Sequence, residues 1–371
     1  MASSSHLQPE DITIIHEPLT HPYGQNMVAL MLAEEFAGRG FRVRIVGQEC
    51  SPEIEERLKA RGITFVRIGR RRCLLDRSEL KSFETWLRDC IFPYEGELHS
   101  EGVTVNTSSM LSLPSTLWYA QGPVSTCLSH VVREQPARYR LAYYLLKPII
   151  QLAECEFINR IRRRVKVIVA NSRYCASLYQ RFGIRVGKVI YPPMDCKVFQ
   201  PSTGSPTSDY VLTYFGKETL WSTIRTIADR GVKVKAFGGK VEDVPRSILE
   251  HPNIEYLGRV ETWRLVELYS NALYTLFTYN HEPFGYIPVE SMACGTPVLT
   301  LKGGGPAESV VDGRTGWLCE NPVQLVEWAL KIWREGYPGW IRMECRKRAL
   351  SFDRRRIAEE WLQLLEGLYS S

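Results

Sequence analysis

The sequence lacks several features that would place it in a simpler class of protein. None of its ten cysteines forms a C-x-x-C pair, which excludes zinc-ribbon and thioredoxin-like redox motifs. No uncharged apolar run reaches about 18 residues, so we expect no membrane-spanning helix. The first residues, MASSSHLQPE, have neither the basic start nor the apolar stretch of a signal peptide. These absences predict a cytoplasmic protein whose cysteines are mostly buried small hydrophobic residues.

Two further absences concern ligands. There is no Asp-x-Asp motif to hold a metal ion, so we predict no metal site and no cofactor. No nucleic-acid-binding motif accompanies the net charge of +6, so we predict no nucleic-acid partner.

The chain instead has a regular alternation of short apolar segments and segments of helical period. Its 371 residues exceed the size of one ordinary core, which predicts two domains. The expected strands are at 11–16, 41–47, 63–68, 103–107, 116–120, 165–170, 210–215, 232–238, 253–258, 273–279 and 296–301. This alternation predicts two doubly wound α/β domains with parallel sheets, and the Pro-, Ser- and Thr-rich stretch 191–209 predicts the linker between them. Ligands then bind in the cleft, at the carboxyl ends of the strands.

The stretch HEPFGYIPVESMACGTPV (281–298) holds two glutamates that point to chemistry. Glu282 follows an expected strand on a loop, and Glu290 lies in the first turn of a helix expected over 287–294. Backbone N–H groups at the start of this helix suit a phosphate, and Glu290 suits the vicinal diol of a ribose. Glu282 is left for hydroxyls beyond the phosphates. A nucleotide-sugar fits all three parts, although each glutamate taken singly is also typical of an ordinary helix start or a solvated loop.

The longer segment EPFGYIPVESMACGTPVLTLKGGGPAESVVDGRTGWL (282–318) resembles the E-x7-E region of the retaining glycosyltransferases with the GT-B fold, of the group 1 or family 4 type. The segment 170–195 is similar to the end of the first domain in those members that extend dolichol-linked oligosaccharides. The resemblance implies an acceptor-binding domain over 1–195 and a nucleotide-sugar-binding domain over 196–351. It also implies a C-terminal helix, 352–371, that crosses back onto the first domain.

The resemblance also implies roles for single residues. Glu282 faces the donor sugar as a catalytic residue, and Glu290 holds the ribose. The other implied donor-binding positions are Phe284, Gly285, Tyr286, Ile287, Arg259 and Val260, the last two beside the base.

Three positions depart from the family pattern. Lys217, after Gly216, stands where an arginine is usual, and we expect it to neutralise the leaving diphosphate. The expected diglycine after the first strand is reduced to Gly24, with His16 as a nearby catalytic candidate beside His21. Gln121 stands where a histidine commonly contacts the transferred sugar, and it donates hydrogen bonds without taking a proton.

Three segments suggest contact with a membrane surface. Basic clusters lie at 67–77 and 159–166, and 137–164 reads either as a core-facing helix or as an interfacial amphipathic helix. Pro148 should kink or split that helix. The basic clusters alone are equally compatible with a solvated face.

Together these observations predict a hexosyltransferase that uses a GDP- or UDP-linked sugar, and the resemblance implies that it retains anomeric configuration. The preferred acceptor is a lipid-linked sugar or glycan at the cytoplasmic face of a membrane, where the protein is peripheral. A soluble acceptor, or a non-catalytic nucleotide-sugar-binding subunit, is the alternative.

Overall fold

The computed structural model describes residues 11–21, 24–69, 78–96, 98, 102–132, 137–239 and 244–369. The chain divides into two compact units. Unit 1 comprises Met1–Thr126, Tyr143–Pro193 and Arg354–Ser371, and unit 2 comprises Cys127–Ala142 and Met194–Asp353.

Unit 1 is built on a parallel sheet whose described residues form seven strands. The central strands are buried on both faces, which accounts for their richness in β-branched, aliphatic and aromatic residues. In spatial order they are β3 (Thr64–Arg67), β2 (Arg42–Gly47), β1 (Asp11–Ile15), β4 (Val103–Asn106), β5 (Ser115–Ala120), β6 (Val165–Ala170) and β7 (Lys188–Val189).

Unit 2 repeats this plan, with six strands among its described residues. Their order is β10 (Ile254–Tyr256), β9 (Val234–Phe237), β8 (Val211–Tyr214), β11 (Thr275–Phe277), β12 (Val298–Leu301) and β13 (Gly316–Cys319). Every pairing in both sheets is parallel. The predicted pair of doubly wound α/β domains is confirmed. The short strands β7 and β13 were not among the expected ones.

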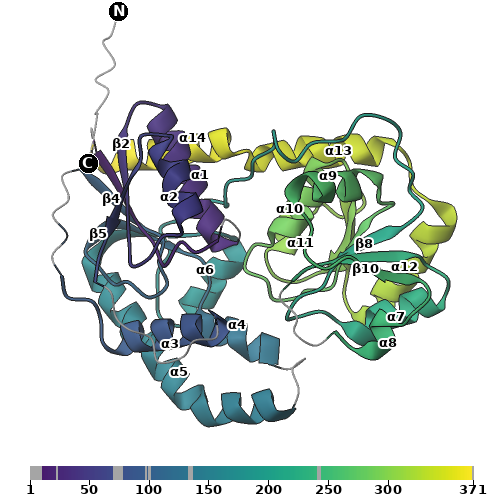
Figure 1. The fold of residues 1–371 in the computed structure, drawn as a ribbon, viewed down its shortest axis with the longest axis horizontal. Coiled ribbons are helices and arrows are strands. Elements are labelled where there is room, and N and C mark those ends of the chain that lie inside the picture. The colour runs from purple at the N-terminus through teal and green to yellow at the C-terminus, as the bar shows by residue number, and fades with distance from the viewer. Residues whose placement is uncertain are drawn as a thin grey trace, which may run out of the picture. The chain divides into compact units, whose positions relative to one another are not determined.

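Helices connect the strands and cover the sheets. Figure 1 shows α9 and α10 on one side of the unit 2 sheet and α7 and α12 on the other. The first seven helices are α1 (Gln25–Gly38), α2 (Pro52–Lys59), α3 (Ser78–Ile91), α4 (Val124–Val131), α5 (Ala137–Arg164), α6 (Arg173–Gln180) and α7 (Trp221–Asp229). The remainder are α8 (Arg246–Leu249), α9 (Thr262–Asn271), α10 (Tyr286–Ala293), α11 (Pro306–Ser309), α12 (Pro322–Glu335), α13 (Trp340–Ala349), the 3-10 turn η2 (Leu350–Phe352) and α14 (Arg354–Tyr369).

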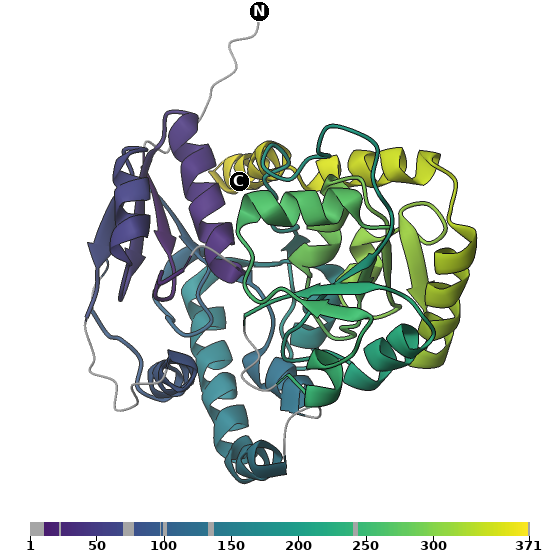
Figure 2. The same cartoon turned by 45° about the vertical axis from the view of Figure 1, so that its right-hand side comes forward.

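Helix α5 runs without interruption through Pro148, so the expectation that this proline splits the helix is wrong. Figure 2 shows α5 as one continuous teal ribbon. A proline inside a helix leaves the carbonyl four residues earlier, here that of Tyr144, without its usual donor. Both residues lie on the exposed side of α5, where water can satisfy that carbonyl.

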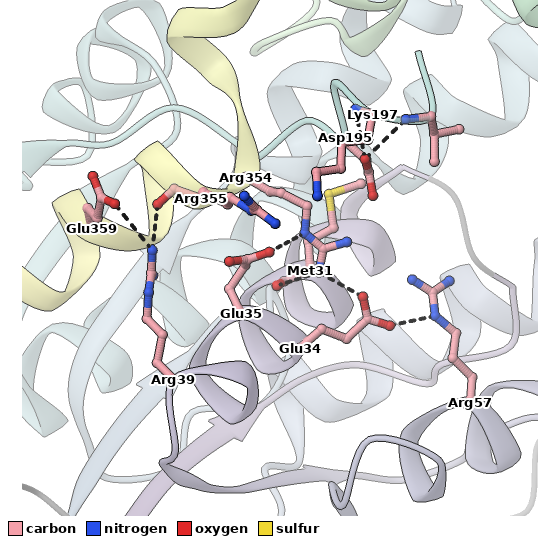
Figure 3. Close-up of polar contacts among 11 residues, drawn as sticks. Met31, Glu34, Glu35, Arg39, Arg57, Asp195, Lys197, Arg354, Arg355 and Glu359 are labelled. Atoms are coloured by element: carbon pink, nitrogen blue, oxygen red, sulfur yellow. Dashed lines mark hydrogen bonds and ion pairs between the residues drawn. The ribbon is translucent and has the colours of Figure 1, made fainter. Parts of the chain in front are cut away.

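Helix α14 packs against α1 within unit 1, as expected of a crossover helix. Arg354, its first residue, donates to Glu34 at 2.8 Å and pairs with Glu35 at 2.7 Å. Figure 3 shows both glutamates on α1 facing Arg354, with Arg57 on the other side of Glu34. Farther along α14 the indole of Trp361 is fully buried against Tyr119, with ring centroids 5.1 Å apart. A buried ion pair and an aromatic contact therefore hold α14 in place.

The carboxylate of Glu34 is the centre of this ion-pair cluster. Its side chain is 1% exposed and accepts hydrogen bonds from Arg57 and Arg354. Burial alone would raise the pKa of Glu34, but the two guanidinium groups outweigh burial and lower it. The charged form is the one that stabilises unit 1, because an uncompensated buried cation would be costly.

We expect Glu34→Gln to lower the free energy of unfolding by about 2 kcal/mol at neutral pH. A lowered folded-state pKa contributes stability above the unfolded pKa, and this contribution is lost as pH falls through the folded value. The melting temperature of the variant should therefore fall less on acidification than that of the wild type. Glu55→Gln, which breaks the more exposed pair with Lys59, is the control and should change little. Equal effects of the two substitutions at neutral pH would contradict the buried-cluster account.

Candidate functional site

The candidate site in unit 2 lies where the strand order reverses. Strand β8 is followed in space by β9 on one side and by β11 on the other. The loops after β8 and β11 therefore diverge at the carboxyl edge of the sheet, where open α/β sheets bind their ligands. The first of these loops carries Gly216 and Lys217, and the second carries Glu282.

Gly216 allows the first loop to pack tightly against the second. A Cβ atom built at Gly216 would lie 2.0 Å from the Tyr279 hydroxyl and 2.5 Å from the Tyr214 ring. Any side chain at this position would displace one of the tyrosines. The predicted donor-binding glycine is thus required by the packing itself.

Helix α10 begins at the end of the second loop, one residue earlier than expected. Gly285 precedes it with a φ of 82°, a left-handed conformation that favours glycine. The Phe284 side chain is buried, with its ring 5.6 Å from that of Tyr286 and 5.7 Å from that of Phe352. Ile287 packs against the core of unit 2. Since these side chains face inward, the groups that the loop can offer a ligand are mainly backbone groups.

Glu290 is held inside the first turns of α10. Its Oε2 accepts a hydrogen bond of 2.9 Å from the Tyr269 hydroxyl. Burial raises the pKa of Glu290 to about 7, although the hydrogen bond from Tyr269 opposes this shift. Burial, and after it the charge of Glu290, raises the pKa of Tyr269 well above its usual value. The carboxyl of Glu290 is therefore oriented, and it titrates near neutral pH.

Glu282 is partly exposed, and its backbone is held by the loop after β12. The N–H of Gly305 donates to the Glu282 carbonyl at 2.8 Å. A Cβ atom at Gly303 would lie 1.9 Å from the side-chain oxygen of Asn280 and 2.7 Å from its backbone oxygen, and one at Gly305 would lie 2.3 Å from the Phe284 Cα, so neither position has room for a side chain. The sequence analysis gave these glycines no role, although the run of three after a strand was the available signal.

Carboxyl groups from different loops gather around two tyrosines. Burial, followed by the charges of Glu282 and Glu290, raises the pKa of Tyr214 to about 12. The pKa of Tyr279 is raised by burial first, and then by Tyr214 and by the charge of Glu282. Both predicted glutamates therefore lie near the end of β8. Glu218, which the sequence analysis did not select, belongs to the same group.

The remaining predicted residues of unit 2 lie at the same edge of the sheet. Lys217 is exposed on the loop after β8. Arg259 is exposed on the loop after β10. This loop passes close to Gly239, where an added Cβ atom would lie 3.4 Å from the Cβ of Arg259. Val260 is partly buried against the core of the unit.

In unit 1, His16 follows β1 and is fully buried. Its Nδ1 lies 2.7 Å from the Thr107 hydroxyl, and its Nε2 lies 2.9 Å from Oδ1 of Asn26. Burial lowers the pKa of His16, with the nearby Glu17 charge opposing the shift. Asn26 in turn donates to the His21 carbonyl at 2.8 Å. These contacts give His16 a structural role in positioning the start of α1, and its catalytic role stays a prediction.

Gly24 and Gln121 also lie at the carboxyl edge of their sheet. Gly24 precedes α1 with a φ of 63°, and a Cβ there would meet no atom within 4 Å. The side-chain amide of Gln121 donates to the Thr107 carbonyl at 2.9 Å, and the backbone carbonyl of Gln121 accepts a hydrogen bond from the side-chain amide of Asn171. Loops after β1, β4, β5 and β6 are thereby tied together.

The described residues contain no group of three or more His, Cys, Asp or Glu side chains placed to bind a metal ion. Seven of the nine described cysteines are buried, as predicted. No described helix is both long and apolar enough to cross a bilayer.

The two basic segments differ in what the structure describes. Residues 70–77 of the first segment lie outside the described residues. In the second segment, 159–166, Arg160 and Arg164 donate hydrogen bonds to the carbonyls of Cys90 and Ser112.

Two family models match the chain. "Glycosyltransferase Family 4" matches residues 22–198, and "Glycosyl transferases group 1" matches residues 245–342.

Curated relatives are similar over shorter segments. Alpha-1,3/1,6-mannosyltransferase ALG2 of Mus musculus is 25% identical over 199 residues, which cover 43% of this chain and 48% of that protein. A probable sucrose-phosphate synthase of Thermosipho melanesiensis is 35% identical over 108 residues, 28% of this chain and 25% of that one. Alpha-1,3/1,6-mannosyltransferase alg-2 of Neurospora crassa is 45% identical over 62 residues, which cover 17% of this chain and 13% of that protein. The matches thus span less than half the length of these relatives.

Solved structures match nearly the whole chain at low identity, which shows the fold. Sucrose-phosphate synthase from Thermosynechococcus elongatus aligns with a TM-score of 0.72 at 18% identity, covering 97% of this chain and 99% of that one. Anabaena HepE, in a complex with UDP-glucose, aligns with a TM-score of 0.65 at 16% identity, covering 97% and 100%. The predicted GT-B fold is confirmed. With both halves matched by models of the same kind of enzyme, the chain belongs to the group 1, family 4 glycosyltransferases.

Proposed function

We propose that the protein transfers a hexose from a nucleotide-diphosphate sugar to an acceptor, with retention of anomeric configuration. The observation that carries this proposal is the gathering of Lys217, Glu282 and Glu290 on the loops and helix start that flank the strand-order reversal of unit 2. The complex of HepE with UDP-glucose, a protein of the same fold, supports a nucleotide-sugar as the ligand.

Each group has a chemical task in the proposed donor site. The carboxylate of Glu290, oriented by Tyr269, accepts hydrogen bonds from the two ribose hydroxyls. Backbone groups from Phe284 to Ile287 contact the phosphates and the sugar, and the positive end of α10 favours their negative charge. Arg259 and Val260 lie beside the base.

The transfer itself breaks the bond between the anomeric carbon and the diphosphate oxygen. Negative charge then grows on the leaving diphosphate, where Lys217 and the N-terminus of α10 stabilise it. Glu282 faces the sugar, whose anomeric carbon gains positive character in the transition state. In unit 1, Gln121, Gly24 and His16 shape the acceptor side, His16 by positioning the start of α1.

We further propose that the acceptor is a lipid-linked sugar at a membrane surface. Helix α5 exposes a row of large apolar side chains at helical spacing, with Leu141 63%, Tyr144 60%, Leu145 72%, Ile149 44% and Leu152 58% exposed. No acidic residue occurs between 137 and 153, while Arg140 and Lys147 supply positive charge beside the row. An apolar stripe flanked by cations suits an anionic lipid surface. The similarity to ALG2 mannosyltransferases supports mannose as the transferred sugar.

Lys217→Ala should lower kcat for sugar transfer, or for slow donor hydrolysis, about 100-fold, because it removes a cation that acts on the leaving diphosphate. Glu282→Ala should lower kcat by at least the same factor. Lys233→Ala, an exposed lysine just before β9 and thus at the opposite edge of the sheet, is the matched control. A wild-type protein inactive with every UDP- and GDP-linked hexose would contradict the enzyme proposal.

Glu290→Gln should weaken binding of the nucleotide-sugar yet raise the melting temperature at pH 8. The folded-state pKa of about 7 lies above the ordinary 4.5, so stability falls as pH rises between these values and the full cost of the buried charge is present above pH 7. The increase in melting temperature caused by Glu290→Gln should therefore be larger at pH 8 than at pH 5. Glu335→Gln, an exposed glutamate at the end of α12, should show no such gain.

Leu145→Glu combined with Leu152→Glu should abolish co-sedimentation with vesicles of phosphatidylcholine and phosphatidylglycerol, because charges replace the apolar row. Val323→Glu changes an equally exposed apolar residue, at 69%, on α12 of unit 2 and should leave vesicle binding intact. Wild-type protein that stays in the supernatant at low salt would contradict the lipid-linked acceptor while leaving the donor site untouched.

A further inference from the structure

Unit 2 contains a cavity of about 340 Å³ that is separate from the candidate site. It is lined by the segment 201–206 of the linker, by the C-terminal ends of α9 and α10, and by α13. Figure 1 shows α13 beside α10, against which it packs. The candidate site uses the N-terminal end of α10 and the loop that leads into α9. The cavity therefore lies at the opposite end of the same two helices.

Two arginines on one face of α13 line this cavity and cap the two helices. Arg342 donates to the carbonyl of Ser270, in the last turn of α9, at 3.1 Å. Arg346, one turn later, donates to the carbonyl of Ala293, at the end of α10, at 2.9 Å. Each helix end carries a partial charge of about −0.5, so two guanidinium groups beside two helix ends leave a net charge of about +1.

No carboxylate neutralises this remaining charge. Within the described part of the chain neither arginine forms an ion pair, and no acidic residue lines the cavity. A net positive charge at the wall of a cavity favours an anionic ligand.

Arg346 also has hydrogen-bond donors left over. Three of the five N–H groups of its guanidinium donate to the carbonyls of Phe199, Ala293 and Cys196. The Nε–H and one N–H of Nη2 have no acceptor among the described residues, and Nε is not closed off from solvent. A guanidinium group with two N–H groups available suits a phosphate, whose oxygens can accept both.

The rest of the lining suits an organic group attached to the anion. Pro201, Pro206 and the exposed Met343 supply apolar surface, and Ser202 is a polar group between them. The linker wall is fixed, because the N–H of Ser202 donates to the Ser270 hydroxyl at 3.0 Å. The volume of the cavity lies at the lower end of the range for small-molecule sites, which is about 300–1,000 Å³.

We propose that this cavity binds a small phosphate monoester, with the phosphate group on Arg346 and the organic part against Pro201, Pro206 and Met343. The ligand enters a second site of unit 2, at the far ends of the helices whose near ends belong to the candidate donor site. The inference does not depend on the proposed function.

The test measures the melting temperature of the protein against increasing glycerol 3-phosphate, with glycerol as the neutral probe. A ligand that binds only the folded protein raises the melting temperature according to its Kd. We expect a saturable rise with glycerol 3-phosphate and none with glycerol. Phosphate also stabilises folded proteins without binding at a site, but that effect is the same in variants that differ at one residue.

Met343→Glu and Met343→Gln form the matched pair of variants. Met343 is 69% exposed and lies one turn before Arg346, so neither change removes a helix cap. The glutamate places a negative charge at the cavity and should raise the Kd for glycerol 3-phosphate by about tenfold or more, whereas the glutamine should keep the wild-type Kd. Equal Kd values for the two variants would overturn the inference. Arg346→Gln removes the proposed phosphate ligand directly, but it also removes the cap of α10, so the Met343 pair decides.

Saturating UDP-glucose should leave the Kd for glycerol 3-phosphate unchanged, because the two ligands occupy different ends of α10. Competition between them would place the phosphate in the donor site and would rule out the second site. A wild-type protein that shows no saturable rise would rule it out as well. Neither result would count against the proposed function, whose tests use the nucleotide-sugar alone.

Discussion

The reversal of strand order between β8 and β11 is the constraint on which the candidate site depends. Parallel strands end at one edge, and the reversal sends the two following loops to opposite sides. Backbone packing then fixes what these loops present, because Gly216, Gly303 and Gly305 let chain segments approach where a Cβ would collide. The carboxyl groups of Glu218, Glu282 and Glu290 are brought together by this packing. In the sequence these three residues lie on separate elements, namely the loop after β8, the loop after β11 and helix α10. No local preference of the chain would bring them together.

Much of the fold could be predicted from the sequence, because buried parallel strands leave a strong apolar signal. The strands missed were β7, which has two residues, and β13, whose segment GWLC begins with glycine and has no β-branched residue. The expectation of a break at Pro148 followed a sound local rule. It failed at a place where Tyr144 and Pro148 are both exposed, so that water can satisfy the freed carbonyl, and only the orientation of α5 reveals this.

The candidate site was less accessible to sequence reasoning. Glu282, Glu290 and the backbone run between them carry a motif, so their positions could be predicted. Tyr269 and Glu218 belong to no motif. Tyr269 matters through its hydrogen bond to Glu290, 21 residues away in the sequence, and Glu218 through the charge of Glu282, 64 residues away, which raises its pKa after burial does. His16 shows the opposite case, in which a position at a strand end suggested catalysis while the side chain is buried between Thr107 and Asn26.

The route of the chain through unit 1 has a consequence for synthesis on the ribosome. Helix α14 is made after the whole of unit 2, yet it supplies Arg354 to Glu34 and Trp361 to the core beside Tyr119. Until α14 emerges, the first-made half of the protein exposes the apolar surface that Trp361 later covers and keeps a buried glutamate short of one partner. The unit translated second can complete its packing first, so vectorial folding of this chain runs against the order of its sequence.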